Sequence, residues 1–522
     1  MAVTPNSRIR LLKCPIELDN KNQLTFASVT AQSTYFLGLP YLEYDGCSYQ
    51  RKDGVIRCKT EPNGITYEDL LEYNYVMYQN TNYDTKWFYA FVDKINYIND
   101  GTTDITIKTD VMQTWKFEIN YQASFVEREM IVTDTRGANV IPEGLETGEY
   151  VSQFVSNFSI GTSHLVMASN IDPRDNSASG GGLYGNIFSG VGYFLFNGAD
   201  KLQNALVSMA AAGKIDGITS IFYCPDFITG YSSASFDANG IATVPNQQGV
   251  ATSIMVPLTP STIDGYTPRN AKLFTYPYIA YVLSNNSGGS MTYHLEDFYN
   301  SGSNLGEIKV RGTCTPGASI RAIPINYRCT PDSLGNNDNN EYGLTLGKFP
   351  ICSFPVDSYL NWQTQQSVNN GLEVAQSTIN AASNVATGNY MGAANNLGGI
   401  FNVIAEQYKH SLVPVQARGN LNSGDVSYTE GKLTYTGYMM NIKAQFARCI
   451  DDYFTMYGYK TNRVKVPNIN SRSNWNYVKT IGCNITGNIP QEDMQQIKDI
   501  YDSGVTLWHN PSTFLDYSQS NT

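Results

Sequence analysis

Alternation of apolar and polar side chains dominates the first part of the chain, between residues 24 and 126. Residues 102–109 alternate, and residues 87–92 are a run of aromatic and other apolar side chains. Both patterns are typical of β-strands. Asp-Gly and Asn-Gly pairs, which predict the hairpin turns of a barrel or sandwich, lie between such runs at residues 45–46, 53–54, 63–64 and 100–101. We therefore predict an N-terminal β domain over residues 1–148.

A mixed pattern follows over residues 149–360. Apolar side chains recur there at helical spacing, at Leu202, Ala205, Leu206 and Met209. This spacing predicts one helix over residues 200–212, before strands resume near Ile221. Stretches rich in Gly, Ser and Asn separate the elements and are typical of loops. We predict a mixed α+β middle domain.

Residues 361–418 have a different character. From Val374 to Ala405 the chain contains no Asp, Glu, Lys or Arg, and apolar residues recur every three or four positions on both sides of Gly388. The pattern predicts a hairpin of two amphipathic helices, over residues 374–387 and 391–405. At 1.5 Å per residue each helix would reach about 21–23 Å, which is short of the hydrocarbon core of a bilayer at about 30 Å.

The β pattern returns over residues 419–522, with predicted strands at 433–442 and 483–487 and a short helix at 491–501. The predicted fold class is therefore mainly β with some α, in the α+β group. No run of 18 apolar residues predicts an ordinary transmembrane helix, and the polar N-terminal residues do not resemble a secretory signal. We expect a protein that is made soluble in a cytoplasm.

Composition narrows the possible functions. Charged residues make up only 16% of the 522 residues, and the 37 Tyr outnumber the 35 Lys and Arg, so the chain does not have the composition of a disordered protein. The net charge of −11 opposes binding of nucleic acid over the whole surface, because that binding depends on clustered cations. The nine Cys show no pair at the spacing of zinc ligands, and buried reduced thiols are the expected state.

Motifs that would indicate catalysis are absent or lack the right context. A Gly-x-Gly-x-x-Gly pattern at residues 180–185 follows a polar run, whereas a dinucleotide site requires a strand before it. The four histidines are far apart in sequence, at His164, His294, His410 and His509. The acid pairs at residues 296–297 and 451–452 fit solvated surface carboxylates better than a glycosidase pair. We predict no enzyme activity, no cofactor and no metal.

One segment has an unusual charge pattern. Between Asp452 and Glu492 there is no acid, but five cations occur, at Lys460, Arg463, Lys465, Arg472 and Lys479. A nucleic-acid contact, a solvated face and a contact between subunits are all compatible with this pattern. A subunit contact matched to an acidic neighbour is favoured, because complementary charges fix the register between copies and a ring of copies follows naturally.

Two groups of residues resemble a known family. The first group lies in the N-terminal domain, at residues 86–92, 101–103, 110–117 and 124–129. The second group lies near the C-terminus, at residues 457–468, 476–480, 487 and 503–509. In residue identity and order the two groups resemble the tail-knob, or distal tail-tube, proteins of small short-tailed phages with protein-primed DNA genomes.

The resemblance implies a homohexameric cylinder at the distal end of the tail in the virion. The two chain ends would build tail-tube β-barrels, with residues 419–522 as the C-terminal part of the tube domain, and the middle domain would be distal. Implied partners are other tail proteins (the proximal tail tube or lower collar), the host cell membrane, and genomic DNA in transit without specific binding. A receptor-binding or glycan-degrading tail protein is the alternative, because abundant aromatic residues can stack on sugars.

The resemblance also assigns a task to the uncharged hairpin of residues 361–418, which would plug the lumen and enter the host membrane. Its candidate plug and membrane-active residues are Ile379, Val385, Tyr390, Met391, Leu397, Ile400, Phe401 and Ile404. Six Asn residues lie within the uncharged run, and each buried amide is costly in lipid unless it finds a partner. Six copies together could pair these polar faces and leave the apolar faces toward lipid.

The same implied tube gives the basic segment an expected position. Lys and Arg on the lumen wall would bind the phosphates of passing DNA and slow it. We therefore expect Lys460, Arg463 and Lys465 at contacts between subunits and not on the wall of the bore.

Overall fold

The computed structural model describes residues 6–353, apart from short gaps, and residues 434–521. The gaps are residues 49, 60–64, 81, 83, 160–162, 185–186, 245–250, 287, 299–303, 317–318, 329–339 and 349–350. The predicted hairpin of residues 361–418, with all eight of its candidate plug residues, therefore lies outside the described residues.

The chain forms two compact units. Unit 1 contains Met1–Glu146, Pro268–Leu273 and Gln445–Thr522, and unit 2 contains Thr147–Thr267 and Phe274–Ala444. Unit 1 thus combines both chain ends with one short internal segment. The predicted strand at 433–442 lies in unit 2, whereas the sequence prediction placed all of residues 419–522 with the N-terminal domain.

The first sheet of unit 1 is antiparallel, six-stranded and built from N-terminal residues only. Its order is β3 (Tyr41–Cys47), β1 (Ser7–Leu12), β5 (Tyr75–Asn80), β6 (Phe88–Asn99), β7 (Thr102–Thr109) and β4 (Val55–Lys59). The Tyr44 hydroxyl of edge strand β3 donates to the Lys59 carbonyl of the other edge strand at 3.4 Å. The sheet therefore curls until its two edges approach each other, around a core that includes Ile9, Ile56 and Ile105.

Two Asp-Gly pairs of this sheet have different structures. Residues 100–101 join β6 to β7, as predicted. Residues 45–46 instead lie inside β3, where the pairing with β1 shifts between Ser7 and Ile9, and Gly46 has a φ of 67°. A glycine in the left-handed region within a strand is typical of a β-bulge. The hairpin turn predicted at residues 45–46 is therefore wrong.

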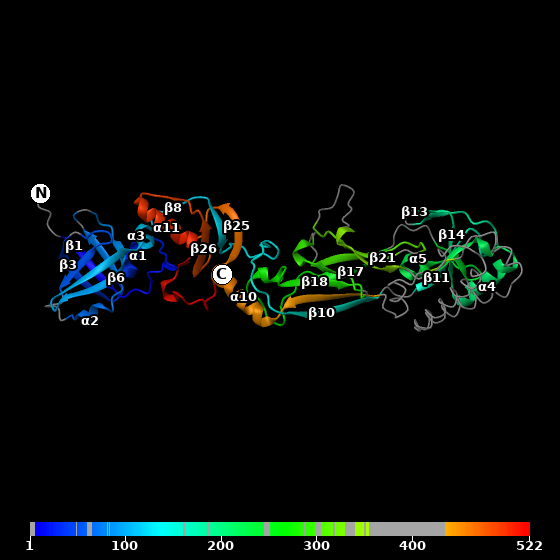
Figure 1. Cartoon of the computed structure of the whole chain (residues 1–522), viewed down its shortest axis with the longest axis horizontal. Coiled ribbons are helices and arrows are strands. Elements are labelled where there is room, and N and C mark those ends of the chain that lie inside the picture. The colour runs from blue at the N-terminus through cyan, green and yellow to red at the C-terminus, as the bar shows by residue number, and fades with distance from the viewer. Residues whose placement is uncertain are drawn as a thin grey trace, which may run out of the picture. The chain divides into compact units, whose positions relative to one another are not determined.

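The second sheet of unit 1 joins the two chain ends. Its order is β2 (Asn22–Leu24), β28 (Val505–Trp508), β26 (Trp475–Ile481), β9 (Ser124–Glu129) and β25 (Tyr459–Lys465), with β2 parallel to β28. The C-terminal strands β25 and β26 are orange in Figure 1. The buried rings of Trp475 and Trp508 lie 5.1 Å apart in the core between this sheet and the first. A small pair, β8 (Asn120–Tyr121) with β27 (Ile485–Thr486), adds to unit 1.

In the part of unit 1 that the structure describes, five α-helices accompany these sheets: α1 (Val29–Leu37), α2 (Tyr67–Leu70), α3 (Val111–Trp115), α10 (Ala444–Tyr457) and α11 (Gln491–Ser503). The predicted helix at 491–501 corresponds to α11. Its buried residues Ile497 and Tyr501 are one turn apart and pack with Val478 of β26, as the helical spacing requires.

The described residues of unit 2 form three larger sheets and a hairpin, all antiparallel. The first sheet is β10 (Tyr150–Ser159), β24 (Thr434–Ile442), β18 (Ile279–Ser284) and β19 (Ser290–Tyr293). The second is β17 (Ala251–Pro257), β20 (Leu305–Arg311), β21 (Ser319–Ile325) and β22 (Leu344–Lys348). The third is β16 (Ile241–Thr243), β14 (Gly192–Phe196), β11 (Ser163–Ser169), β15 (Ile218–Pro225) and β23 (Ile351–Ser353). The hairpin pairs β12 (Gly182–Tyr184) with β13 (Ile187–Ser189).

The third sheet carries the helix predicted from periodicity, α4 (Ala199–Ala211), beside the short helix α5 (Asp226–Thr229). Leu202, Leu206 and Met209 of α4 are buried in one cluster with Phe194 and Phe196. The Gly-x-Gly-x-x-Gly pattern begins before β12 of the hairpin and not at a junction from a strand to a helix. The described structure is mainly β with some α, as predicted.

Candidate functional site

The predicted interface cations lie on and near the edge strand β25. Lys460, Arg463 and Lys465 belong to β25 itself, and Lys479 belongs to β26 of the same sheet. Strand β9 separates β25 from β26, and β25 has no neighbour on its outer side among the described strands. The free side of an edge strand can pair with another chain, so the basic segment is placed where an additional contact is possible.

Two of the three β25 residues are tied to acids of their own chain. Lys465 Nζ donates to Glu129 Oε1 at 2.6 Å, and Glu129 is only 2% exposed. The Lys460 backbone N–H donates to Glu143 Oε1 at 3.0 Å. Arg463 is exposed and has no hydrogen bond or ion pair with the residues that the structure describes. Lys465 therefore has its charge paired within the chain, whereas Arg463 is exposed and its charge remains available to a partner.

A row of exposed apolar side chains crosses the same sheet. Phe125 of β9 lies directly opposite Val464 of β25 and also opposite Ile481 of β26. Val464 is 72% exposed, Ile481 58% and Phe125 36%. Residues directly opposite one another on neighbouring strands share a face, so the three side chains form one continuous patch, which we call the apolar row. Exposed apolar patches of this kind often mark contact surfaces.

A buried ionic cluster lies behind β25. The Glu143 side chain is fully buried and forms ion pairs with Arg128 and Lys272. Arg128 also donates to the Gly458 carbonyl at 2.7 Å. Burial lowers the pKa of Lys272, and the cations Arg128 and Lys460 lower it further, while Glu143 opposes them. The cluster joins three parts of the sequence that unit 1 brings together.

The buried carboxylate of Asp451 fixes the same internal segment. It accepts from the backbone N–H groups of Arg269 at 2.9 Å and Asn270 at 3.0 Å, and from the Asn270 side chain at 2.9 Å. Asp451 is 0% exposed, so the prediction that it is a solvated surface acid is wrong, whereas the side chain of Asp452 is 65% exposed. The Tyr459 hydroxyl and the Ala271 N–H both donate to Asp134, which adds a further tie.

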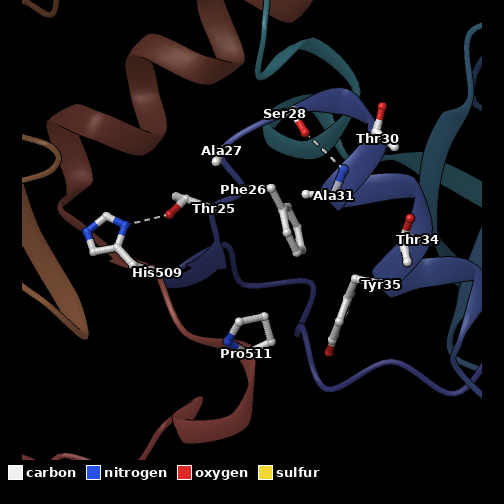
Figure 2. A pocket seen from close by; sticks show the side chains of 10 residues that line it. All are labelled: Thr25, Phe26, Ala27, Ser28, Thr30, Ala31, Thr34, Tyr35, His509 and Pro511. Atoms are coloured by element: carbon white, nitrogen blue, oxygen red, sulfur yellow. Dashed lines mark hydrogen bonds between the residues drawn. The ribbon is translucent and has the colours of Figure 1, made fainter.

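A pocket of about 640 Å³ opens beside the N-terminus of α1, and Figure 2 shows the Phe26 ring at its centre. His509 lies at one side, with Nδ1 2.7 Å from the Thr25 hydroxyl and Nε2 3.0 Å from Asn476 Oδ1. Burial, and then the charge of Lys116, lowers the pKa of His509 to about 4. Both ring nitrogens of His509 therefore have a polar partner within the chain. His509 therefore has a structural role here.

The two other described histidines lie in unit 2. His164 stacks on Tyr231, with ring centroids 3.5 Å apart, and pairs with Asp226 at 2.5 Å. His294 stacks on Tyr276 and lies 3.1 Å from Asp297. In the described ranges, no group of three or more His, Cys, Asp or Glu side chains is arranged to hold a metal ion.

Sequence reasoning missed the ionic cluster and the Asp451 site. The residues of the cluster come from positions 128, 143 and 272, and no short motif joins them. The only local signal was the sharp fall in acid content after Asp452. The apolar row was also missed, because Phe125, Val464 and Ile481 become neighbours only through strand pairing.

Comparison with known proteins identifies the class. Residues 5–120 match the family described as the N-terminus of the caudoviral major tail protein. Residues 242–522 match the C-terminal domain of the tail knob protein gp9 of Bacillus phage phi29. The chain is therefore a structural component of a phage tail, and it is a virion protein.

Full-length relatives agree with this class. The chain is 28% identical to the tail knob protein gp9 of Bacillus phage PZA, with 98% of both chains covered. It is 25% identical to that of Bacillus phage B103 over 97% of both, and 26% identical to that of phage phi29 over 88% of both. The match to the gp9 C-terminal domain spans more than half of the chain, so the chain belongs to the tail knob protein gp9 family. The solved tail knob protein gp12 of bacteriophage C1 has the same fold, with a TM-score of 0.63, 15% identity and 98% of both chains covered.

Proposed function

We propose that this chain forms a homohexameric tube at the distal end of the tail, which is first plugged and then serves as the conduit for genome ejection, without catalytic activity. The match to tail knob proteins along nearly the whole chain carries this proposal. The net charge of −11 is consistent with it, because an acidic molecule binds passing DNA weakly. The proximal tail tube or lower collar would be the neighbouring tail protein.

The apolar row and Arg463 are the proposed contact between neighbouring subunits. The row supplies apolar surface that is buried on association, and Arg463 supplies a charge that an acidic patch of the next copy can match. Lys465 and Lys460 support this surface from within the subunit, through Glu129 and Glu143. The three cations then contribute to assembly and do not face the bore.

Residues 361–418 are the proposed plug, which leaves the lumen and enters the host membrane. Within the described part of the chain, none of the helices combines the length and the apolar character needed to span a bilayer. The uncharged run from residue 374 to 405 supports the proposal, since six copies can pair their Asn residues and present Ile, Leu, Val and Phe to lipid.

Size-exclusion chromatography with light scattering, joined to a liposome-leakage assay, tests this function. Wild-type protein should elute as a hexamer and release a trapped dye, and deletion of residues 363–413 should abolish release while the hexamer remains. Val464→Asp with Ile481→Asp should instead give monomers, whereas Val207→Asp, on the exposed face of α4, should not. A monomeric wild type, or leakage unchanged by the deletion, would contradict the proposal. Turnover of glycans by the purified protein would favour the glycan-degrading alternative.

A further inference from the structure

One of the two histidine–tyrosine stacks of unit 2 is open to solvent. Tyr276 lies shortly before β18, and its ring stacks on His294 with centroids 4.0 Å apart and planes at 14°. Tyr276 is 46% exposed, and in the described part of the chain no second ring contacts it. In the other stack, Tyr231 on His164, the tyrosine is only partly exposed and its hydroxyl donates to Asn197 at 2.7 Å. Much of the Tyr276 ring is therefore accessible to a ligand.

The guanidinium of Arg328 lies beside this open stack and has three partners. Its Nη2 lies 2.8 Å from His294 Nδ1, its Nη1 donates to the Tyr342 hydroxyl at 3.3 Å, and its Nε forms an ion pair with Asp297. A guanidinium carries more N–H groups than these contacts use. Asp297 makes its ion pairs through Oδ2, which leaves Oδ1 as an acceptor. Because the Arg328 side chain is 37% exposed and that of Asp297 26%, both can reach a ligand.

The backbone that carries Arg328 has an uncommon conformation. Asn326 and Arg328 have φ values of 57° and 54°, in the left-handed region that residues with a side chain rarely adopt. Tyr327, between them, pairs with Phe298 in an isolated bridge, and the Arg328 N–H donates to the Asp297 carbonyl at 2.7 Å. Strained residues of this kind cluster at functional sites. The strain indicates a loop shaped to hold Arg328 beside Asp297.

The stack and the guanidinium rest on a fixed base. The Tyr327 ring is 1% exposed and packs edge-on against Tyr342, with centroids 5.1 Å apart. The Tyr327 hydroxyl accepts from the His294 N–H at 3.1 Å. On the other side, the Glu296 carboxylate accepts from the Tyr276 N–H at 3.0 Å. Backbone and ring positions are thus held from below, and a preformed site of this kind loses little freedom when it binds.

We propose that Tyr276, His294, Asp297 and Arg328 bind one neutral hexopyranose unit of a glycan, without cleaving it. The C–H face of a pyranose ring stacks on an aromatic side chain such as Tyr276. Two adjacent hydroxyls of the sugar then meet one group that donates, the Arg328 guanidinium, and one that accepts, Asp297 Oδ1. This sugar site goes beyond the conduit function and depends on neither the hexamer nor the plug.

The charges of the site favour a neutral ligand. Arg328 and Asp297 carry opposite charges and already form an ion pair, so their combined field attracts neither an anion nor a cation strongly. Glu296, next to Asp297 in the chain, further opposes a phosphate or a carboxylate. A polyhydroxylated ring requires donors and acceptors side by side, and these residues supply both.

Saturation-transfer difference NMR on the full chain tests the proposal, with maltose, lactose and N,N′-diacetylchitobiose as probes. At least one of these disaccharides should give difference signals, and a titration then gives its Kd. Tyr276→Ala removes the stacking ring and should weaken binding about tenfold, whereas Tyr276→Phe keeps the ring and should bind within about twofold of the wild type. Arg328→Gln removes the fork of donors and should weaken binding about fivefold or more.

Tyr231→Ala is the matched control, because it removes the tyrosine of the other histidine stack and should leave binding unchanged. Thermal melting followed by circular dichroism checks that each variant is folded. The proposal is overturned if none of the three disaccharides gives a signal, if folded Tyr276→Ala binds as the wild type does, or if inorganic phosphate displaces the sugar. Release of monosaccharides from a probe would also overturn it, because the site would then be catalytic. A wild-type hexamer that binds none of the probes would contradict the sugar site alone.

Discussion

The two units differ in what their interiors contain. Among the residues that the structure describes, every buried charged residue belongs to unit 1: Arg10, Asp110, Arg128, Glu129, Lys272, Asp451 and Asp493. The buried polar residues of unit 2 are neutral: Ser169, Ser220, Thr229, Thr275 and Asn441. Unit 1 therefore depends on matched charges in its core, and unit 2 on apolar packing.

The difference corresponds to how each unit is assembled from the chain. Unit 1 gathers three separate segments, and several of its buried ions lie where those segments meet, as at Glu143 with Lys272 and at Asp451 with Asn270. A buried ion is costly without its partner, so each pair penalises a wrong arrangement more than it stabilises the right one. We infer that the ions of unit 1 select the pairing of its segments, which a proposed tube wall would require.

The largest expected effect follows from the removal of the Asp451 carboxylate. Asp451→Ala leaves two backbone N–H groups and the Asn270 amide without their acceptor, and should cost unit 1 about 3–5 kcal/mol. Asp452→Ala, one position further, removes an exposed carboxylate and should cost less than about 1 kcal/mol. Urea unfolding with hydrogen exchange of peptides from each unit measures both. An equal loss of protection in unit 2 would contradict the contrast between the units.

A smaller loss of stability is expected at the Glu143 cluster. It tests whether the buried ions stabilise unit 1 directly or mainly select the pairing of its segments. Glu143→Gln should cost about 2–4 kcal/mol, because Arg128 and Lys272 stay buried while their shared carboxylate is removed. Adding Lys272→Met should recover at least about 1 kcal/mol, because the uncompensated charge is then replaced by an apolar side chain. A double-mutant cycle from urea midpoints measures this coupling. If the double variant is less stable than either single one, the ions stabilise unit 1 directly.

The smallest effect concerns pH. The pKa of His509 is lowered from 6.5 to about 4 in the folded chain, so its contribution to stability is lost as the pH falls from about 6.5 to about 4. Asp110 acts in the opposite sense: burial raises its pKa from 3.8 to about 6, so stability rises as the pH falls through that range. The two effects oppose each other, so neither can be read from the pH dependence of the stability of the wild type alone.

Comparison of the wild type with His509→Gln separates the effect of His509 from that of Asp110. Relative to this variant, the Tm of the wild type should fall by about 3–6 °C between pH 7 and pH 4.5. Scanning calorimetry at both pH values measures the difference. A constant difference between wild type and His509→Gln would show that His509 does not titrate as its burial requires.

Part of the fold was predictable because its signal is local. Alternation predicted β7, the spacing of Leu202, Leu206 and Met209 predicted α4, and the pattern at 491–501 predicted α11. The prediction of a hairpin turn at residues 45–46 failed because a Gly in the left-handed region fits a bulge as well as a hairpin. Only the pairing of β3 with β1 distinguishes the bulge from the hairpin. The prediction that Asp451 is a surface acid failed for a related reason, since its hydrogen-bond partners lie more than 180 residues earlier.

The sequence by itself determined the mainly β character, the positions of α4 and α11, the uncharged run and the two groups of residues that resemble tail knob proteins. Each of these depends on periodicity or on residues close together in the chain. Only the tertiary structure decided that Asp451 is buried, that Lys465 pairs with Glu129, and that the three residues of the apolar row are neighbours. Burial and pairing arise from contacts between distant segments, and these contacts leave no regular spacing in the sequence.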